Sequence, residues 1–147
     1  MELNFEELSA EIEKKLRKAR SMSLATRAGE GVAARTVCCQ NDGMTAFFIT
    51  HKDSDKVKQM RDNPNVALVI DNMRITAEAE LFGHPQGKPE YMRINKKKFP
   101  IYAKIYKSTS DDLLILFHPV KIKIYKYVGQ PCEDVLDVKK AKAYRVL

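Results

Sequence analysis

The sequence predicts an α+β protein that is mainly β, a barrel of six or seven antiparallel strands with peripheral helices. Three observations support this. An amphipathic helical stretch opens the chain, short stretches with strand character follow it, and turn signals separate most of these instead of the long helices of a βαβ sheet. We therefore expect sequence neighbours to pair antiparallel, with the helices outside the barrel.

Length and composition are those of one ordinary domain. The chain has 147 residues, of which 44% are hydrophobic and 31% charged, with no internal repeat, low-complexity segment or domain boundary. We expect a single domain over residues 1–147. No stretch approaches the roughly 20 apolar residues of a membrane helix, and the acidic opening MELNFEELSAEIEKK is unlike a signal peptide. The sequence therefore predicts a cytoplasmic protein without a membrane segment.

The first predicted element is a helix over residues 5–19. Its glutamates crowd the first turns and its lysines and arginines the last, which complements the helix dipole. The apolar positions that recur at helical spacing are Phe5, Leu8, Ile12, Leu16 and Ala19.

Three strands are predicted next, over residues 22–28, 32–40 and 44–50. The first two are separated by Gly-Glu-Gly at 29–31, and the last two by Asn-Asp-Gly at 41–43. We expect these three strands to form a meander.

A short helix and a hairpin follow. Residues 54–63 are too polar for a strand, and Asp53 or Ser54 can cap a helix there. Residues 65–71 and 74–83 form the predicted hairpin, and the second of these segments alternates apolar and polar residues.

The remaining predicted elements are a helical stretch and two strands. The helical stretch runs from about Pro89 to Lys107 and is interrupted at 99–100. The strands, 113–118 and 120–128, flank Pro119.

The cysteines and histidines predict no metal site. Cys38 and Cys39 are adjacent on a predicted strand, so they point to opposite faces, and with Cys132 the count is odd. The three histidines are dispersed without metal-binding spacing. We expect the cysteines to be small buried hydrophobic side chains.

A phosphate site is the chemical hypothesis that the residues support. If ARTVCCQ is a strand and FFITHKDSDK is a strand running into a helix, Arg35 can approach the loop at 50–56. There Thr50, Ser54 and Lys56 gather around a helix N-terminus, whose free N–H groups favour anions. The alternative is that Ser54 only caps the helix and that Lys56 is only solvated.

In these segments the chain resembles the pyridoxamine 5'-phosphate oxidase-like family of FMN-binding split β-barrels, especially its short bacterial branch of general-stress and flavin proteins. The likeness runs from about Met22 to Gly83. At ARTVCCQ the family has an arginine, an apolar run and often a lysine five positions later. Arg35 matches the arginine, and Gln40 replaces the lysine.

The resemblance continues in the next segment, although Asp55 stands where the oxidases usually carry arginine. The residues that fit are Thr50, Ser54, Lys56, Asn63 and Pro64.

The resemblance implies a homodimer with FMN in a groove between the subunits. Arg35 and the Ser54–Lys56 region would hold its phosphate, and its ring would lie against the strand backbone near Val37–Cys39. Glu78 falls near a position where the oxidases commonly use glutamine. The cofactor-binding residues expected on this basis are Arg35, Val37, Cys38, Cys39, Gln40, Thr50, His51, Ser54, Lys56 and Glu78.

An FMN-dependent oxidoreductase or flavin reductase is the implied activity, with a small-molecule substrate or NAD(P)H as partner. The segment CEDVLDVKKAKAYRVL lacks the basic motif with which the oxidases bind pyridoxamine phosphate, so the substrate and the catalytic residues stay unassigned.

Two alternatives remain open. The resemblance also allows a deazaflavin or haem in place of FMN, because relatives of this fold bind these cofactors. The net charge of +7, concentrated in residues 88–107, also allows a non-enzymatic nucleic-acid binder. No RNA-binding aromatic motif, zinc finger or recognition helix accompanies that charge, so we expect no nucleic acid as partner.

Overall fold

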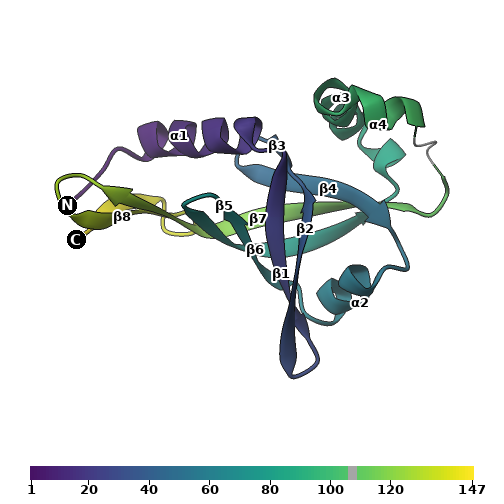
Figure 1. Ribbon diagram of the computed structural model, residues 1–147, viewed down its shortest axis with the longest axis horizontal. Coiled ribbons are helices and arrows are strands. Elements are labelled where there is room, and N and C mark those ends of the chain that lie inside the picture. Colours follow the sequence, from purple (N-terminus) through teal and green to yellow (C-terminus); the bar gives the residue numbers. More distant parts are fainter. Residues whose placement is uncertain (106–108) are drawn as a thin grey trace.

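One antiparallel sheet dominates the computed structural model, which describes residues 1–105 and 109–147 (Figure 1). Within these residues seven strands follow the order β2-β1-β5-β6-β7-β4-β3, with β8 paired to β7 and β9 to β8. The strands are β1 (Ser21–Ala28), β2 (Gly31–Cys38), β3 (Gln40–Asp42), β4 (Thr45–His51), β5 (Asn65–Ile70), β6 (Met73–Gly83), β7 (Asp112–Tyr127), β8 (Pro131–Asp137) and β9 (Lys142–Val146).

The predicted fold class is confirmed, because the described chain is mainly an open antiparallel sheet with helices at its periphery. The described residues form nine strands, not the predicted six or seven. The difference comes partly from β8 and β9, which lie in a C-terminal segment for which the sequence predicted no strand.

The predicted meander is wrong in its third strand. β1 and β2 pair along their whole lengths, as expected, but β4 pairs with β3 and β7. The predicted strand over 32–40 is broken at Cys39, after which Gln40 begins β3. Among the described strands β2 pairs with β1 alone, so its other edge is open and the barrel is split there.

Pro119 lies inside β7, although the sequence predicted two strands on either side of it. It pairs with Ala77 of β6, where the register shifts. On the other side of β7, the β4 pairing ends at Phe117 and the β8 pairing begins at Lys121. Proline has no backbone N–H to donate to a neighbouring strand. Position 119 lies between the β4 and the β8 pairing, where neither strand needs that donor.

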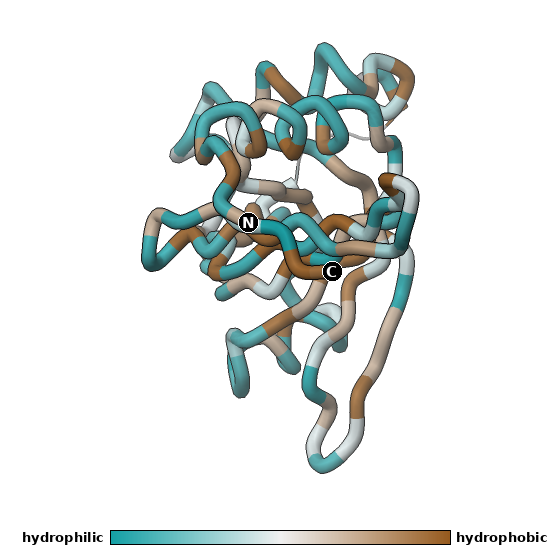
Figure 2. The backbone as a smooth tube through the Cα atoms, turned by 90° about the vertical axis from the view of Figure 1, so that its left-hand side faces the viewer, coloured by the Kyte–Doolittle hydropathy of each residue, from teal (hydrophilic) through white to brown (hydrophobic). Residues whose placement is uncertain are grey.

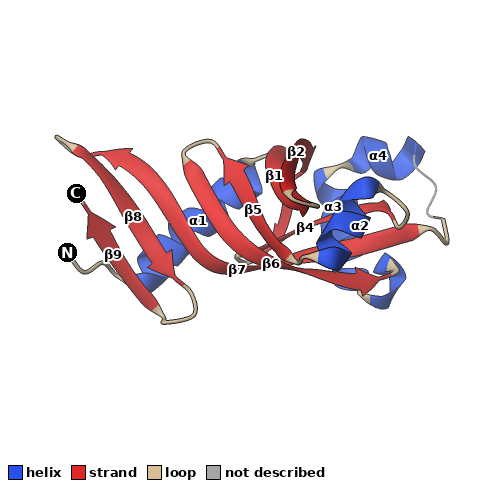
Figure 3. Cartoon of the chain, turned by 90° about the horizontal axis from the view of Figure 1, so that it is seen from below, coloured by secondary structure: helices blue, strands red, loops and turns tan. Residues whose placement is uncertain are grey.

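The predicted helices are confirmed. They are α1 (Phe5–Lys18), α2 (Asp55–Asp62), α3 (Pro89–Lys98) and α4 (Pro100–Ile105), with a 3-10 turn η1 (Pro85–Gly87). The predicted end of the last helical stretch at Lys107 lies outside the described residues. The helices α1, α3 and α4 lie on one side of the sheet and α2 on the other (Figures 1 and 3). No helix in the described residues is long and apolar enough to cross a membrane.

Two apolar clusters hold these layers together. The larger joins the sheet to α1, whose buried residues are Leu8, Ile12 and Leu16, and also includes Val57 and Met60 of α2. The smaller lies under α3 and consists of Phe47, Tyr91, Leu114 and Leu116. The β1–β2 hairpin projects beyond this body and carries hydrophobic as well as polar residues (Figure 2).

Candidate functional site

Arg35 lies on β2 opposite Leu24 of β1, and its side chain reaches the helix α2. Its Nη2 donates to Oε1 of Gln59 on α2 at 2.7 Å, and its Nη1 donates to Oγ1 of Thr26 at 2.8 Å and to the carbonyl of Leu24 at 3.3 Å. All three acceptors are uncharged. The structure therefore anchors Arg35 beside α2 without neutralising its charge.

The N-terminus of α2 contributes a serine without a hydrogen bond. Ser54 occupies the N-cap position, as predicted, but its side chain makes no capping bond. Its hydroxyl oxygen is shielded from solvent and has no hydrogen-bond partner among residues 1–105 and 109–147. Buried hydroxyls normally have a partner, so Ser54 is available to a group that is not part of this chain.

Lys56, in the first turn of α2, is the second cation of this corner. Burial and the nearby charge of Arg35 lower the pKa of its amine, against a smaller opposing effect of Asp55. Within the described residues neither Arg35 nor Lys56 has an ion-pair partner at 4.0 Å or less. We refer to Arg35, Ser54 and Lys56 as the α2 site.

An anion would relieve each of these features. Two cations repel one another across a partly buried corner, and an anion between them turns the repulsion into attraction. The N–H groups at the start of α2 add a partial positive charge. Arg35 is bonded to the helix whose first turn carries Lys56, and its charge acts on Lys56. This donor set suits a phosphate group, and the role of Arg35, Ser54 and Lys56 in binding one stays a prediction.

Thr50 and His51 end β4, just before the loop that leads to α2. Thr50 is half-buried and shares a strand face with Ala46 and Phe48 of the core. His51 is exposed; its Nδ1 accepts from the backbone N–H of Asp53 at 3.1 Å. These contacts shape the loop. The role of Thr50 and His51 in cofactor binding stays a prediction.

The run from Val37 to Gln40 is arranged differently from the single predicted strand. The side chains of Val37 and Cys39 belong to the core, and burial raises the pKa of the Cys39 thiol to about 11. Cys38 is half-buried at the end of β2. Gln40 is 1% exposed, and its Oε1 accepts from Asn95 of α3 at 2.8 Å.

Gln40 consequently lies apart from the α2 site. Its side chain is held by α3, whereas Arg35 is held by α2 on the opposite side of the sheet (Figure 1). The position where the family often has a lysine therefore contributes no charge next to Arg35.

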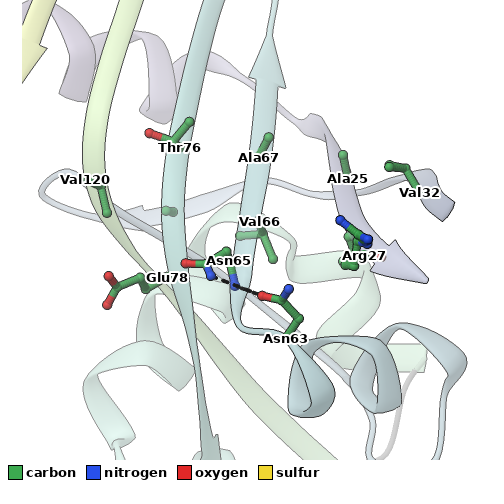
Figure 4. A pocket seen from close by; sticks show the side chains of 12 residues that line it. Ala25, Arg27, Val32, Asn63, Asn65, Val66, Ala67, Thr76, Glu78 and Val120 are labelled. Atoms are coloured by element: carbon green, nitrogen blue, oxygen red, sulfur yellow. Dashed lines mark hydrogen bonds between the residues drawn. The ribbon is translucent and has the colours of Figure 1, made fainter. Parts of the chain in front are cut away.

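A groove of about 450 Å³ lies beside β1 and the C-terminal end of α2, and none of the three residues of the α2 site lines it (Figure 4). Thr26, which binds Arg35, contributes to its wall, and Asn63 at the end of α2 lies on its rim. Glu78 also lines the groove, but its carboxylate is paired with Lys139 at 3.1 Å. Small residues, including Ala25 and Ala67, form much of its floor.

Two residues of the corner, Thr26 and Gln59, were missed by the sequence analysis. Signals for both were present. Met22, Leu24 and Thr26 alternate along β1, which places Thr26 on the buried face. Gln59 follows Lys56 by three positions, so the two side chains share a side of α2.

Comparisons with known proteins identify the family of this chain. The family model described as pyridoxamine 5'-phosphate oxidase matches residues 8–126. No curated protein sequence matches the chain.

Several solved structures share the fold, and two of the three described here have a cofactor in their names. A pyridoxamine 5'-phosphate oxidase-related, FMN binding protein from Nostoc punctiforme is 14% identical over 99% of this chain and 98% of its own, with a TM-score of 0.66. General Stress Protein 26 from Bacillus anthracis is 15% identical over 89% and 98%, with a TM-score of 0.68. An F420 reductase is 18% identical over 75% and 94%, with a TM-score of 0.60.

Identities this low establish the fold alone, whereas the family match covers most of the chain, including β1, β2 and α2. The protein belongs to the pyridoxamine 5'-phosphate oxidase family.

Proposed function

We propose that the protein binds FMN, with the phosphate at the α2 site, and uses it as an oxidoreductase or flavin reductase. The observation that carries the proposal is the pair of unneutralised cations, Arg35 and Lys56, beside an unbonded Ser54 hydroxyl at the start of α2. A phosphomonoester supplies the missing negative charge and several acceptor oxygens. Each charge-assisted hydrogen bond contributes about 1.5 to 3 kcal/mol.

The open edge of β2 supports the placement of the flavin ring. An edge strand has peptide N–H and C=O groups that no neighbouring strand uses, and a flat ring bearing nitrogen and oxygen atoms can match them. Arg35 lies on this edge strand three residues before its end at Cys38, so the Val37–Cys39 region directly follows the residue that bonds to α2.

A homodimer is part of the proposal. The outer face around the groove presents Val32 and Val69, which are 73% and 43% exposed, beside Ala25 and Ala67. A second copy seated on this face would cover apolar surface and close the groove. Sedimentation at increasing protein concentration tests this, and a Val69→Lys variant should shift the equilibrium toward monomer.

The flavin, when bound, supplies the redox chemistry, and the chain supplies binding, orientation and exclusion of water. Arg35 and Lys56 would hold the phosphate end of the flavin beside α2. The reaction partner is a small molecule or NAD(P)H, and no described side chain is assigned a catalytic role.

A deazaflavin is the second candidate cofactor. The family pattern often has a lysine at the position of Gln40. This chain lacks that cation near the phosphate site, and Gln40 is buried against α3. The fold is also that of a protein named F420 reductase.

Titration of the purified protein with FMN, riboflavin, FAD and the deazaflavin F420 tests both candidates. We expect FMN to bind at least roughly tenfold more tightly than riboflavin, which lacks the phosphate, because a charge-assisted bond is at stake. Equal affinity for FMN and riboflavin would remove the phosphate assignment. Tighter binding of F420 than of FMN would replace FMN by the deazaflavin, and a Soret band in the protein as purified would replace both by haem.

A further inference from the structure

We propose that Thr26 and Gln59 form a clamp that orients Arg35, so that one edge of its guanidinium faces the phosphate group. This inference rests on the proposed function, because it concerns the same phosphate. Thr26 and Gln59 are positioning residues in it, since they act through Arg35.

The clamp consists of two oxygen atoms that lie close together. Oγ1 of Thr26 and Oε1 of Gln59 are 2.6 Å apart, and the threonine hydroxyl donates to the glutamine carbonyl. Each oxygen also accepts from Arg35, from Nη1 at 2.8 Å and from Nη2 at 2.7 Å. Thr26 is 2% exposed and Gln59 is half-buried, so water competes little for these bonds.

The clamp determines which N–H groups of Arg35 remain. A guanidinium has five N–H groups in a rigid plane. The two N–H groups of Nη1 donate to the Leu24 carbonyl and to Thr26. One N–H group of Nη2 donates to Gln59. Because the two clamp oxygens are adjacent, they accept hydrogen bonds along the guanidinium edge that runs from Nη1 to Nη2.

The two remaining N–H groups lie on the other edge, one on Nε and one on Nη2. The structure gives neither an acceptor among the described residues. Two parallel N–H groups on one edge are the arrangement that binds two oxygens of one phosphate. The clamp thus presents Arg35 as a bidentate phosphate ligand.

The clamp is also uncharged, which matters for the ligand. A carboxylate at position 59 would hold Arg35 at least as firmly, but it would cancel the charge that the phosphate needs and would repel the phosphate itself. An amide carbonyl and a hydroxyl orient the guanidinium and leave its charge in place.

The test compares Gln59→Met and Gln59→Glu by titration with FMN and with riboflavin. Methionine keeps the length of the side chain but removes the acceptor, so we expect FMN binding to weaken roughly three- to tenfold. Gln59→Glu should weaken FMN binding further. Riboflavin binding should be unchanged in both, since the clamp acts only on the phosphate. Thr26→Val, nearly isosteric, should weaken FMN binding by a smaller factor.

Lys58→Gln is the matched control. Lys58 is exposed on the same helix, and its replacement lowers the local charge by one unit, as Gln59→Glu does. The clamp is refuted if Gln59→Glu weakens FMN binding no more than Lys58→Gln does, or if Gln59→Met binds FMN as tightly as the wild type. The proposed function fails differently, through a wild-type protein that does not prefer FMN to riboflavin. Thermal melting of each variant identifies loss of fold.

Discussion

Two charged corners of this protein differ in whether their charges are paired within the chain. At the end near the termini, Asp134 receives Nε and Nη2 of Arg145 at 2.6 and 3.0 Å. Nζ of Lys126 lies 2.8 Å from Asp134 and 2.8 Å from Glu11 of α1. We call these four residues the Asp134 network; it contains two acids and two cations. The α2 site has two cations and no paired acid.

The difference separates structural charge from ligand-binding charge. The Asp134 network joins β7, β8, β9 and α1, and its charges are balanced within the chain. The α2 site is close to balance only if an anion is added. Removing a charge should therefore reduce stability at the first corner and ligand affinity at the second.

The largest effect is expected from Asp134→Ala. Asp134 is 2% exposed, so the change leaves Arg145 without its carboxylate partner and Lys126 with Glu11 alone, at a cost of about 3 kcal/mol in unfolding free energy. Urea denaturation measures this. Glu13→Ala, which removes an exposed ion pair with Arg17, should cost no more than about 0.5 kcal/mol.

The same residue predicts an acid limb of stability. Hydrogen bonds from Arg145 and Lys126 hold the pKa of Asp134 below its usual value, despite burial. The stabilisation is therefore complete above the unfolded pKa of about 3.9 and is lost as the pH falls through the folded pKa. A wild-type acid limb as flat as that of Asp134→Ala would contradict the paired nature of this corner.

Arg35→Ala should show the opposite pattern. We expect FMN affinity to fall by one to two powers of ten, as the loss of about 1.5 to 3 kcal/mol implies, with little change in stability. Arg27→Ala on the same hairpin is the control, because within the described part of the chain the side chain of Arg27 bonds to the carbonyl of Gly29 and not to α2. Calorimetric titration checks both, and equal FMN affinities would place the phosphate elsewhere.

Lys56 should make FMN binding sensitive to alkaline pH. Burial and Arg35 lower its pKa below 10.5, so it loses its proton, and the phosphate one cation, at a lower pH than a free lysine. FMN affinity should decline as the pH rises through this folded pKa. Riboflavin, measured in parallel, corrects for ionisation of the shared ring, and Lys56→Arg should remove the decline because arginine stays charged.

Without ligand, the lowered pKa of Lys56 should make the stability of the fold rise with pH, whereas FMN affinity falls. The unfolded chain binds this proton more tightly, so the unfolding free energy should rise between the folded pKa and 10.5. A decline in stability over that interval, absent from Lys56→Arg, would contradict the lowered pKa.

Ser54→Ala should have the smallest effect. The Ser54 side chain caps nothing in the structure, so the usual cost of about 1 kcal/mol for losing an N-cap should be absent. We expect roughly a two- to fivefold loss of FMN affinity, for one uncharged hydrogen bond. Thermal melting and titration together check this, since a loss of stability without a loss of affinity would assign Ser54 to the helix instead.

The sequence by itself determined the local features of this protein. The apolar spacing of α1, the break between α3 and α4, and the hairpins β1–β2 and β5–β6 depend on residues close together in the chain. It also led us to expect Arg35 near the helix that begins after Ser54, because a basic residue on a strand and a polar helix start form a recognisable pattern, and Arg35 does bond to Gln59 of that helix.

Only the tertiary structure decided which strands became neighbours and where polar side chains found partners. β4 lies beside β7, not β2, since both of its faces are buried by apolar side chains from distant segments. Gln40 turned to Asn95 rather than to Arg35, and Thr26 with Gln59 came to hold Arg35. These contacts join residues far apart in the chain, and their free energy depends on the packing of the whole fold, which no local pattern records.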